Sequence, residues 1–75
     1  MITDLNSILI FRTNIKTPGA KKKALDVLST FEEIDQATID QSDIDCVLRI
    51  VSAALSAEEI ITIMTEAGFE CSELE

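Results

Sequence analysis

The stretch FRTNIKTPGAKKKALDVL, residues 11–28, places an extended segment, a short loop and a helix in immediate succession. Its start belongs to the apolar run of residues 7–15, which is rich in β-branched and aromatic side chains and too short for a typical helix. Thr17 is a favoured N-cap, and Pro18 suits the first helical position. The stretch therefore predicts a strand that passes through a tight loop into a helix over residues 18–31.

A loop between a strand and a helix is a place where many small proteins hold a metal or a phosphate. The loop of residues 14–20 contains no cysteine, no histidine and no carboxylate. The only glycines of the chain are Gly19 and Gly68, so a glycine-rich phosphate motif is also missing. The loop has the position of a binding site without the side chains that such a site uses.

Two further strands are expected after the helix. IDQATID, residues 34–40, has Ala37 and Ile39 two positions apart, as a strand requires. IDCVLRIVSAA, residues 44–54, follows after a short break, which indicates an antiparallel hairpin. Its side chains form two alternating sets, which are Ile44, Cys46, Leu48 and Ile50 on one face and Val47, Arg49 and Val51 on the other.

LSAEEIITIMTEAGF, residues 55–69, is the clearest helical segment. Ser56 and Glu59 match a capping box, and Gly68 is placed to end the helix. The tail FECSEL can supply a last short strand. The predicted order β-α-β-β-α-β, joined by right-handed crossovers, gives an α+β ferredoxin-like sandwich: a four-stranded antiparallel sheet with both helices on one face. We expect a single domain over residues 1–75, with residues 1–6 frayed.

Composition excludes several classes of function. The 75 residues carry a formal net charge of −8, which opposes binding to phosphate backbones, and they contain three Phe but no Tyr, Trp or His. Without His, none of the serines has its usual activating base, so we expect neither an enzyme nor a cofactor. No apolar run approaches the ~20 residues of a membrane span, and no signal peptide is evident. We therefore expect a cytoplasmic protein with no nucleic-acid or membrane partner.

The two cysteines do not form a recognisable metal motif. Cys46 and Cys71 match no zinc spacing, and in a reducing cytosol each is expected to be a free thiol that packs as a small hydrophobe. The scattered carboxylates do not follow the spaced pattern of a calcium loop.

The segments IDQATID and TEAGFEC (residues 65–71) resemble the second-strand and terminal signatures of the heavy-metal-associated domain of copper chaperones and metal-transporting ATPases. The resemblance covers residues 8–74. In that family a G-M-T-C-x-x-C motif opens the first helix. The spacing from Ile34 implies that Thr17 stands at the first ligand cysteine and Ala20 at the second. A hydroxyl and a methyl group are not ligands for Cu(I), which prefers soft thiolates. The resemblance therefore implies a degenerate member that has lost its metal ligands.

Three lysines, Lys21, Lys22 and Lys23, lie in the first turn of the predicted helix beside this loop. The resemblance implies a docking patch for an acidic partner domain. An anion site at the helix start and a merely solvated basic face are the alternatives.

The two central strands predict an apolar patch on the sheet face that the helices leave open. In both strands neighbouring positions are apolar, so whichever set packs under the helices leaves the other exposed. We take Leu9, Phe11, Val47 and Val51 as this candidate patch. It is expected to be covered, most simply by a second copy of the chain, and the alternative is a tolerated apolar surface.

The sequence thus predicts a small, non-enzymatic protein-interaction module that resembles a heavy-metal-associated domain without its ligands. One alternative is a metal-trafficking protein that binds metal through Cys46 or Cys71 in a non-standard thiol site. A ligand-sensing domain is a third possibility, because related folds bind small effectors, although no effector pocket is evident in the sequence. The identity of the partner is not encoded in any motif.

Overall fold

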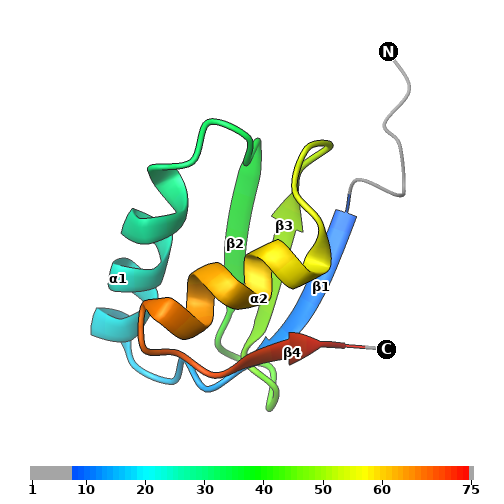
Figure 1. Cartoon of the computed structure of the whole chain (residues 1–75). Helices are drawn as coiled ribbons and strands as arrows, with labels where there is room; N and C mark the ends of the chain where they lie inside the picture. Colours follow the sequence, from blue (N-terminus) through cyan, green and yellow to red (C-terminus); the bar gives the residue numbers. More distant parts are fainter. Residues whose placement is uncertain (1–7, 75) are drawn as a thin grey trace.

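The computed structural model describes residues 8–74 (Figure 1). The elements, in chain order, are β1 (Ile8–Thr13), α1 (Pro18–Ser29), β2 (Gln36–Asp40), β3 (Val47–Val51), α2 (Ala57–Glu66) and β4 (Cys71–Glu73). This order confirms the predicted β-α-β-β-α-β arrangement. The expected frayed segment, residues 1–6, lies outside the described residues.

The four strands form one sheet in the order β2-β3-β1-β4, and every neighbouring pair is antiparallel. Both helices lie on the same side of this sheet (Figure 1). The fold is the α+β ferredoxin-like sandwich that the sequence predicts.

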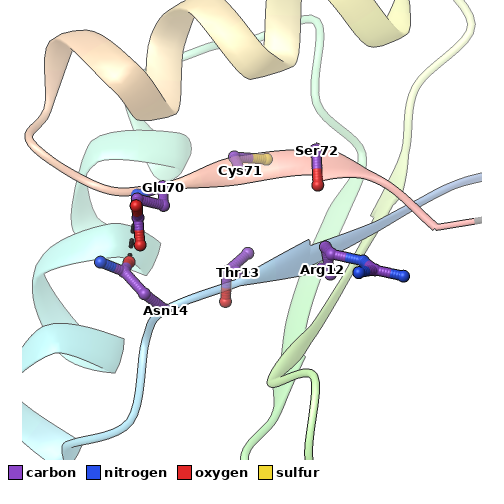
Figure 2. Close-up of a pocket in the computed structure, with 6 residues that line it drawn as sticks. All are labelled: Arg12, Thr13, Asn14, Glu70, Cys71 and Ser72. Carbon is purple, nitrogen blue, oxygen red and sulfur yellow. Dashed lines mark hydrogen bonds between the residues drawn. The ribbon is translucent and has the colours of Figure 1, made fainter.

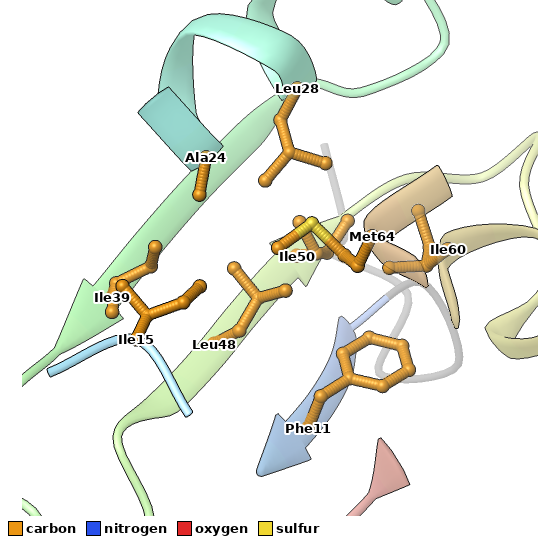
Figure 3. Packing of buried hydrophobic residues seen from close by; sticks show 9 residues of the cluster. All are labelled: Phe11, Ile15, Ala24, Leu28, Ile39, Leu48, Ile50, Ile60 and Met64. Atoms are coloured by element: carbon orange, nitrogen blue, oxygen red, sulfur yellow. The ribbon is translucent and has the colours of Figure 1, made fainter. Parts of the chain in front are cut away.

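The core lies between the sheet and the two helices (Figure 3). Ala24 and Leu28 of α1 and Ile60 and Met64 of α2 are all fully buried. The remaining members of the core come from the sheet and from the loop after β1, and they are Phe11, Ile15, Ile39, Leu48 and Ile50. Because protein interiors are close-packed, this core is sensitive to any change of side-chain volume.

The register of β1 corrects one part of the predicted open-face patch. Phe11 is paired with Leu48, which places both side chains under the helices, and Phe11 is fully buried. Leu9, two positions earlier, packs against the same core. The expectation that Leu9 and Phe11 lie on the open face is therefore wrong, because a two-residue period gives that face to Ile8 and Ile10 instead.

On β3, Val47 and Val51 lie on the face opposite the buried Leu48 and Ile50. Val47 is nevertheless only 9% exposed. Val51 therefore offers a larger apolar surface on the open face than Val47 does.

The start of β3 also differs from the expected alternation. Cys46 has a φ of 45°, in the left-handed region, and lies just before the strand. This turn breaks the two-residue period, so Ile44 projects from the β2–β3 connection with 92% of its surface exposed.

Local capping residues define the helices as predicted. Ser56 and Glu59 make both hydrogen bonds of the capping box at the start of α2. At its end Gly68 adopts a φ of 95°, and the N–H groups of Gly68 and Phe69 donate to the carbonyls of Thr65 and Met64, each at 3.0 Å. These two bonds make a Schellman motif, which explains the glycine at this position. Helix α1 begins at Pro18 as predicted and ends at Ser29, two residues before the expected limit.

Within residues 8–74, no helix has the length and apolar character that crossing a bilayer requires.

Candidate functional site

The two positions that the resemblance equates with metal ligands form the N-terminal cap of α1. Thr17 is the N-cap residue, and its Oγ1 accepts a hydrogen bond from the backbone N–H of Ala20 at 3.1 Å. The carbonyl of Thr17 accepts the first bond of the helix, from Lys21 N at 3.0 Å. Thr17 thus satisfies a helix donor that would otherwise need another acceptor.

Gln41, which follows β2, fixes the same loop from the side. Its Nε2 donates to the carbonyl oxygen of Thr17 at 2.7 Å and to that of Ile15 at 3.3 Å. Ile15 itself is fully buried in the core. One amide group therefore joins the β2–β3 connection to the loop that leads into α1.

Asn14 and Thr13 hold the other side of the loop (Figure 2). Asn14 Oδ1 accepts from the backbone N–H of Glu70 at 3.0 Å, just before β4. Thr13 Oγ1 accepts from Ile15 N at 3.2 Å and donates to the carbonyl of Cys46 at 2.7 Å. Side-chain hydrogen bonds thus tie this region to both ends of the β2–β3 connection and to the residue before β4, which gives the loop a defined conformation.

These loop contacts were not predicted from the sequence. Gln41 lies 24 residues from Thr17, and Asn14 lies 56 residues from Glu70. No local motif marks such pairs, because each depends on the tertiary fold.

The three lysines of the predicted docking patch do not have equivalent surroundings. Lys21 and Lys22 border a shallow hollow of 430 Å³ beside the loop, whose lining is completed by Pro18, Leu25, Asp26 and Gln41. Lys23 lies on the other side, with Nζ 5.6 Å from the ring centroid of Phe69, within the range of a cation–π contact. Lys21 and Lys22 are therefore the members of the cluster that face the loop surface.

The two cysteines are free thiols in protected positions. Cys46 is 4% exposed, and Cys71 is half-buried on β4, opposite Thr13 in the sheet register. Burial raises the pKa of the Cys71 thiol to about 11. Because the thiolate is the form that binds metals and attacks electrophiles, Cys71 is a weak ligand and a weak nucleophile at neutral pH.

No group of three or more Cys, Asp or Glu side chains with the geometry of a metal site occurs in the described part of the chain. Beside Cys71, a shallow groove of 370 Å³ lies between the end of β1 and β4, lined by Arg12, Thr13, Asn14, Glu70, Cys71 and Ser72 (Figure 2).

Comparison with known proteins finds a solved structure with a similar fold. No protein-family model and no curated protein matches the sequence. Among solved structures, the solution structure of the yeast copper transporter domain Ccc2a, determined in apo and Cu(I)-loaded states, superposes with a TM-score of 0.78. The alignment covers 92% of this chain and 96% of that domain, at 14% sequence identity. The chain has the fold of a copper transporter domain. At this identity the likeness establishes the fold.

Proposed function

We propose that this chain is a non-enzymatic protein-interaction module on a copper-transporter-domain fold, whose helix-start loop does not bind metal. The observation that carries the proposal is the hydrogen bond between Thr17 Oγ1 and Ala20 N. The resemblance places these residues where two thiolates would hold the ion, and here a hydroxyl serves as a helix cap beside a methyl group. Neither group is a ligand that Cu(I) prefers.

The contact surface in this proposal is the loop of residues 14–20 together with Lys21 and Lys22. The loop is held by Gln41 and Asn14, so a partner meets a surface that is already ordered. Preorganisation of this kind reduces the entropic cost of association. Two lysines beside it, in a chain of net charge −8, favour a partner with an acidic surface.

The chemistry of the cysteines supports this reading over metal trafficking through a non-standard thiol site. Cys46 is buried, and the Cys71 thiolate is disfavoured because burial raises its pKa to about 11. Two free thiols in one small domain fit the reducing cytoplasm, which is the compartment we infer.

Two measurements test the proposal. First, Cu(I) is titrated into the protein in competition with a chromogenic chelator, and we expect the protein to take no Cu(I) from the chelator. Uptake that disappears in Cys46→Ser or Cys71→Ser would overturn the proposal in favour of metal trafficking.

Second, partners are captured from the native cell extract with the wild-type chain and with Lys21→Gln/Lys22→Gln. We expect the double variant to lose a protein that the wild type retains. The matched control is Thr62→Glu/Thr65→Glu, which makes the same change of two charge units at exposed positions of α2. Equal loss in both variants would assign the effect to net charge rather than to the loop surface, and would contradict the proposed contact site.

A further inference from the structure

The sheet face that the helices leave uncovered carries an apolar strip with two arginines beside it, away from the loop of residues 14–20. We propose that this face binds an acidic amphipathic helix of a partner protein. The inference rests on the proposed function of the chain as an interaction module, and it assigns a class of partner to a different surface.

An apolar strip crosses the open face at one end of β1 and β3. Ile8 is directly opposite Val51, and Ile10, which is 36% exposed, is two positions further along β1. Leu74 lies beside Ile10, because its N–H donates to the Ile10 carbonyl at 3.0 Å. Ile8, Ile10, Val51 and Leu74 thus supply adjacent branched side chains from both central strands and from the residue after β4.

Both arginines of the chain lie on this same face. Arg49 is directly opposite Ile10, and Arg12 is two positions beyond Ile10 on β1; both are exposed. The other strand residues of the face within residues 8–74 are Gln36, Thr38, Asp40, Val47 and Ser72. Only one of them, Asp40, is a carboxylate, so two cations oppose one anion on a face of a chain that has fourteen acidic residues.

Asp40 offsets only one of the two arginine charges. It lies at the end of the edge strand β2, and its carboxylate accepts hydrogen bonds from the side chain and the backbone N–H of Ser42. These bonds, with a smaller contribution from Arg49, lower the pKa of Asp40. The arginines beside the apolar strip therefore favour a negatively charged occupant.

The size of the face accommodates a helix, and its charge disfavours a second copy of the chain. Four strands spaced about 4.8 Å apart, with five residues at about 3.3 Å each, give a face of roughly 19 by 16 Å. A helix of three turns is about 16 Å long and about 10 Å wide, so it fits within this face. A second copy would bring two arginines against two arginines, whereas an acidic helix would pair them with carboxylates.

The experiment uses the full chain, labelled with ¹⁵N, and a designed 14-residue helical peptide. The peptide has Leu on one face and Glu on both flanks, and a matched peptide carries Lys in place of Glu. We expect the Glu peptide to shift the amide signals of β1 and β3 selectively, with binding that weakens as salt is added. The Lys peptide is expected to cause no such shifts.

Ile10→Glu and Arg49→Glu are each expected to raise the Kd of the Glu peptide about tenfold, as loss of a central interface side chain does. Thr62→Glu/Thr65→Glu makes the same change of two charge units as Arg49→Glu at exposed positions of α2, away from both proposed surfaces, and should leave Kd within about twofold.

Equal binding of both peptides, or shifts confined to the loop of residues 14–20, would overturn the proposal. Sedimentation of the chain at tens of micromolar tests whether a second copy covers the face instead. A monomer of 8.2 kDa is expected. A dimer that becomes a monomer in Ile10→Glu would show that a second copy covers the face and would overturn the proposal. If the Glu peptide does not bind the sheet face but Lys21→Gln/Lys22→Gln still abolishes capture of the native partner, the proposed function stands without this inference. Uptake of Cu(I) in the chelator competition would instead overturn the proposed function and would not affect binding of the peptide.

Discussion

Thr17 and Ala20 are joined by a hydrogen bond of 3.1 Å between the hydroxyl of the first and the backbone N–H of the second. The same two positions are those that the family resemblance assigns to metal ligands. A group that caps a helix and a group that binds Cu(I) place different demands on one residue, because the cap needs a hard oxygen acceptor and the ion prefers a soft thiolate. This relationship leads to a direct test by restoring the sulfur atoms.

The variant Thr17→Cys/Ala20→Cys is expected to bind one Cu(I) per chain in chelator competition, whereas the wild type is expected to bind none. Thiols at a helix N-terminus have a lowered pKa, which favours the metal-binding thiolate. Loss of the threonine cap should lower the free energy of unfolding by about 1 kcal/mol in the metal-free variant.

Thr17→Ser/Ala20→Ser serves as the control for this experiment, since it keeps a capping hydroxyl and adds no sulfur. It should resemble the wild type in the titration. A folded Thr17→Cys/Ala20→Cys variant that takes up no Cu(I) would show that the two positions do not correspond to a metal site.

Gln41→Ala tests how strongly the loop is held. The substitution removes hydrogen bonds to the carbonyls of Thr17 and Ile15, and we expect the free energy of unfolding in urea to fall by about 1–2 kcal/mol. Gln36→Ala, at an exposed position of β2, is the matched control and should change it by no more than about 0.5 kcal/mol. Equal effects of the two substitutions would mean that Gln41 does not stabilise the loop.

The features that could be predicted from the sequence are those with local signals. The cap at Thr17, the capping box at Ser56 and the helix end at Gly68 each depend on residues within one or two turns, and all three occur in the structure. These signals placed the two helices, the apolar runs between them placed the strands, and the fold followed from the resulting order of elements.

The faces of the central strands could not be predicted in the same way. In β1 both alternating sets are apolar, so the pattern alone does not say whether Phe11 or Ile10 is buried. Pairing with β3 decides this, because Phe11 lies opposite Leu48 beneath the helices. The left-handed turn at Cys46 likewise removes Ile44 from the strand without any glycine or proline to mark it.

Substitution of the two glycines by alanine is expected to have opposite effects. Gly68 has a φ of 95°, and a Cβ there would meet no atom within 4 Å, so the cost of Gly68→Ala is backbone strain of about 1–2 kcal/mol. Gly19 lies in the first turn of α1, also in open space, and Gly19→Ala should stabilise the protein by about 0.5–1 kcal/mol. Thermal unfolding of both variants measures the difference, and a destabilising Gly19→Ala would contradict the assigned helix start.

The Cys71 thiol is expected to react slowly with iodoacetamide at pH 8. Burial raises its pKa from 9.0 to about 11, so the thiolate fraction, and with it the alkylation rate at this site, should be about a hundredfold below that of a free cysteine. The modified residue is identified by mass spectrometry, which separates Cys71 from Cys46.

The same shift predicts a pH dependence of stability. The pKa of Cys71 is higher in the folded than in the unfolded chain, so its contribution to stability is complete below about pH 9 and is lost as the pH rises toward 11. Between about pH 9 and pH 11 the free energy of unfolding of the wild type should therefore fall relative to that of Cys71→Ala. A difference that is constant from pH 8 to pH 11, together with rapid alkylation at pH 8, would show that the thiol is solvated and available, and would reopen the possibility that Cys71 binds a metal.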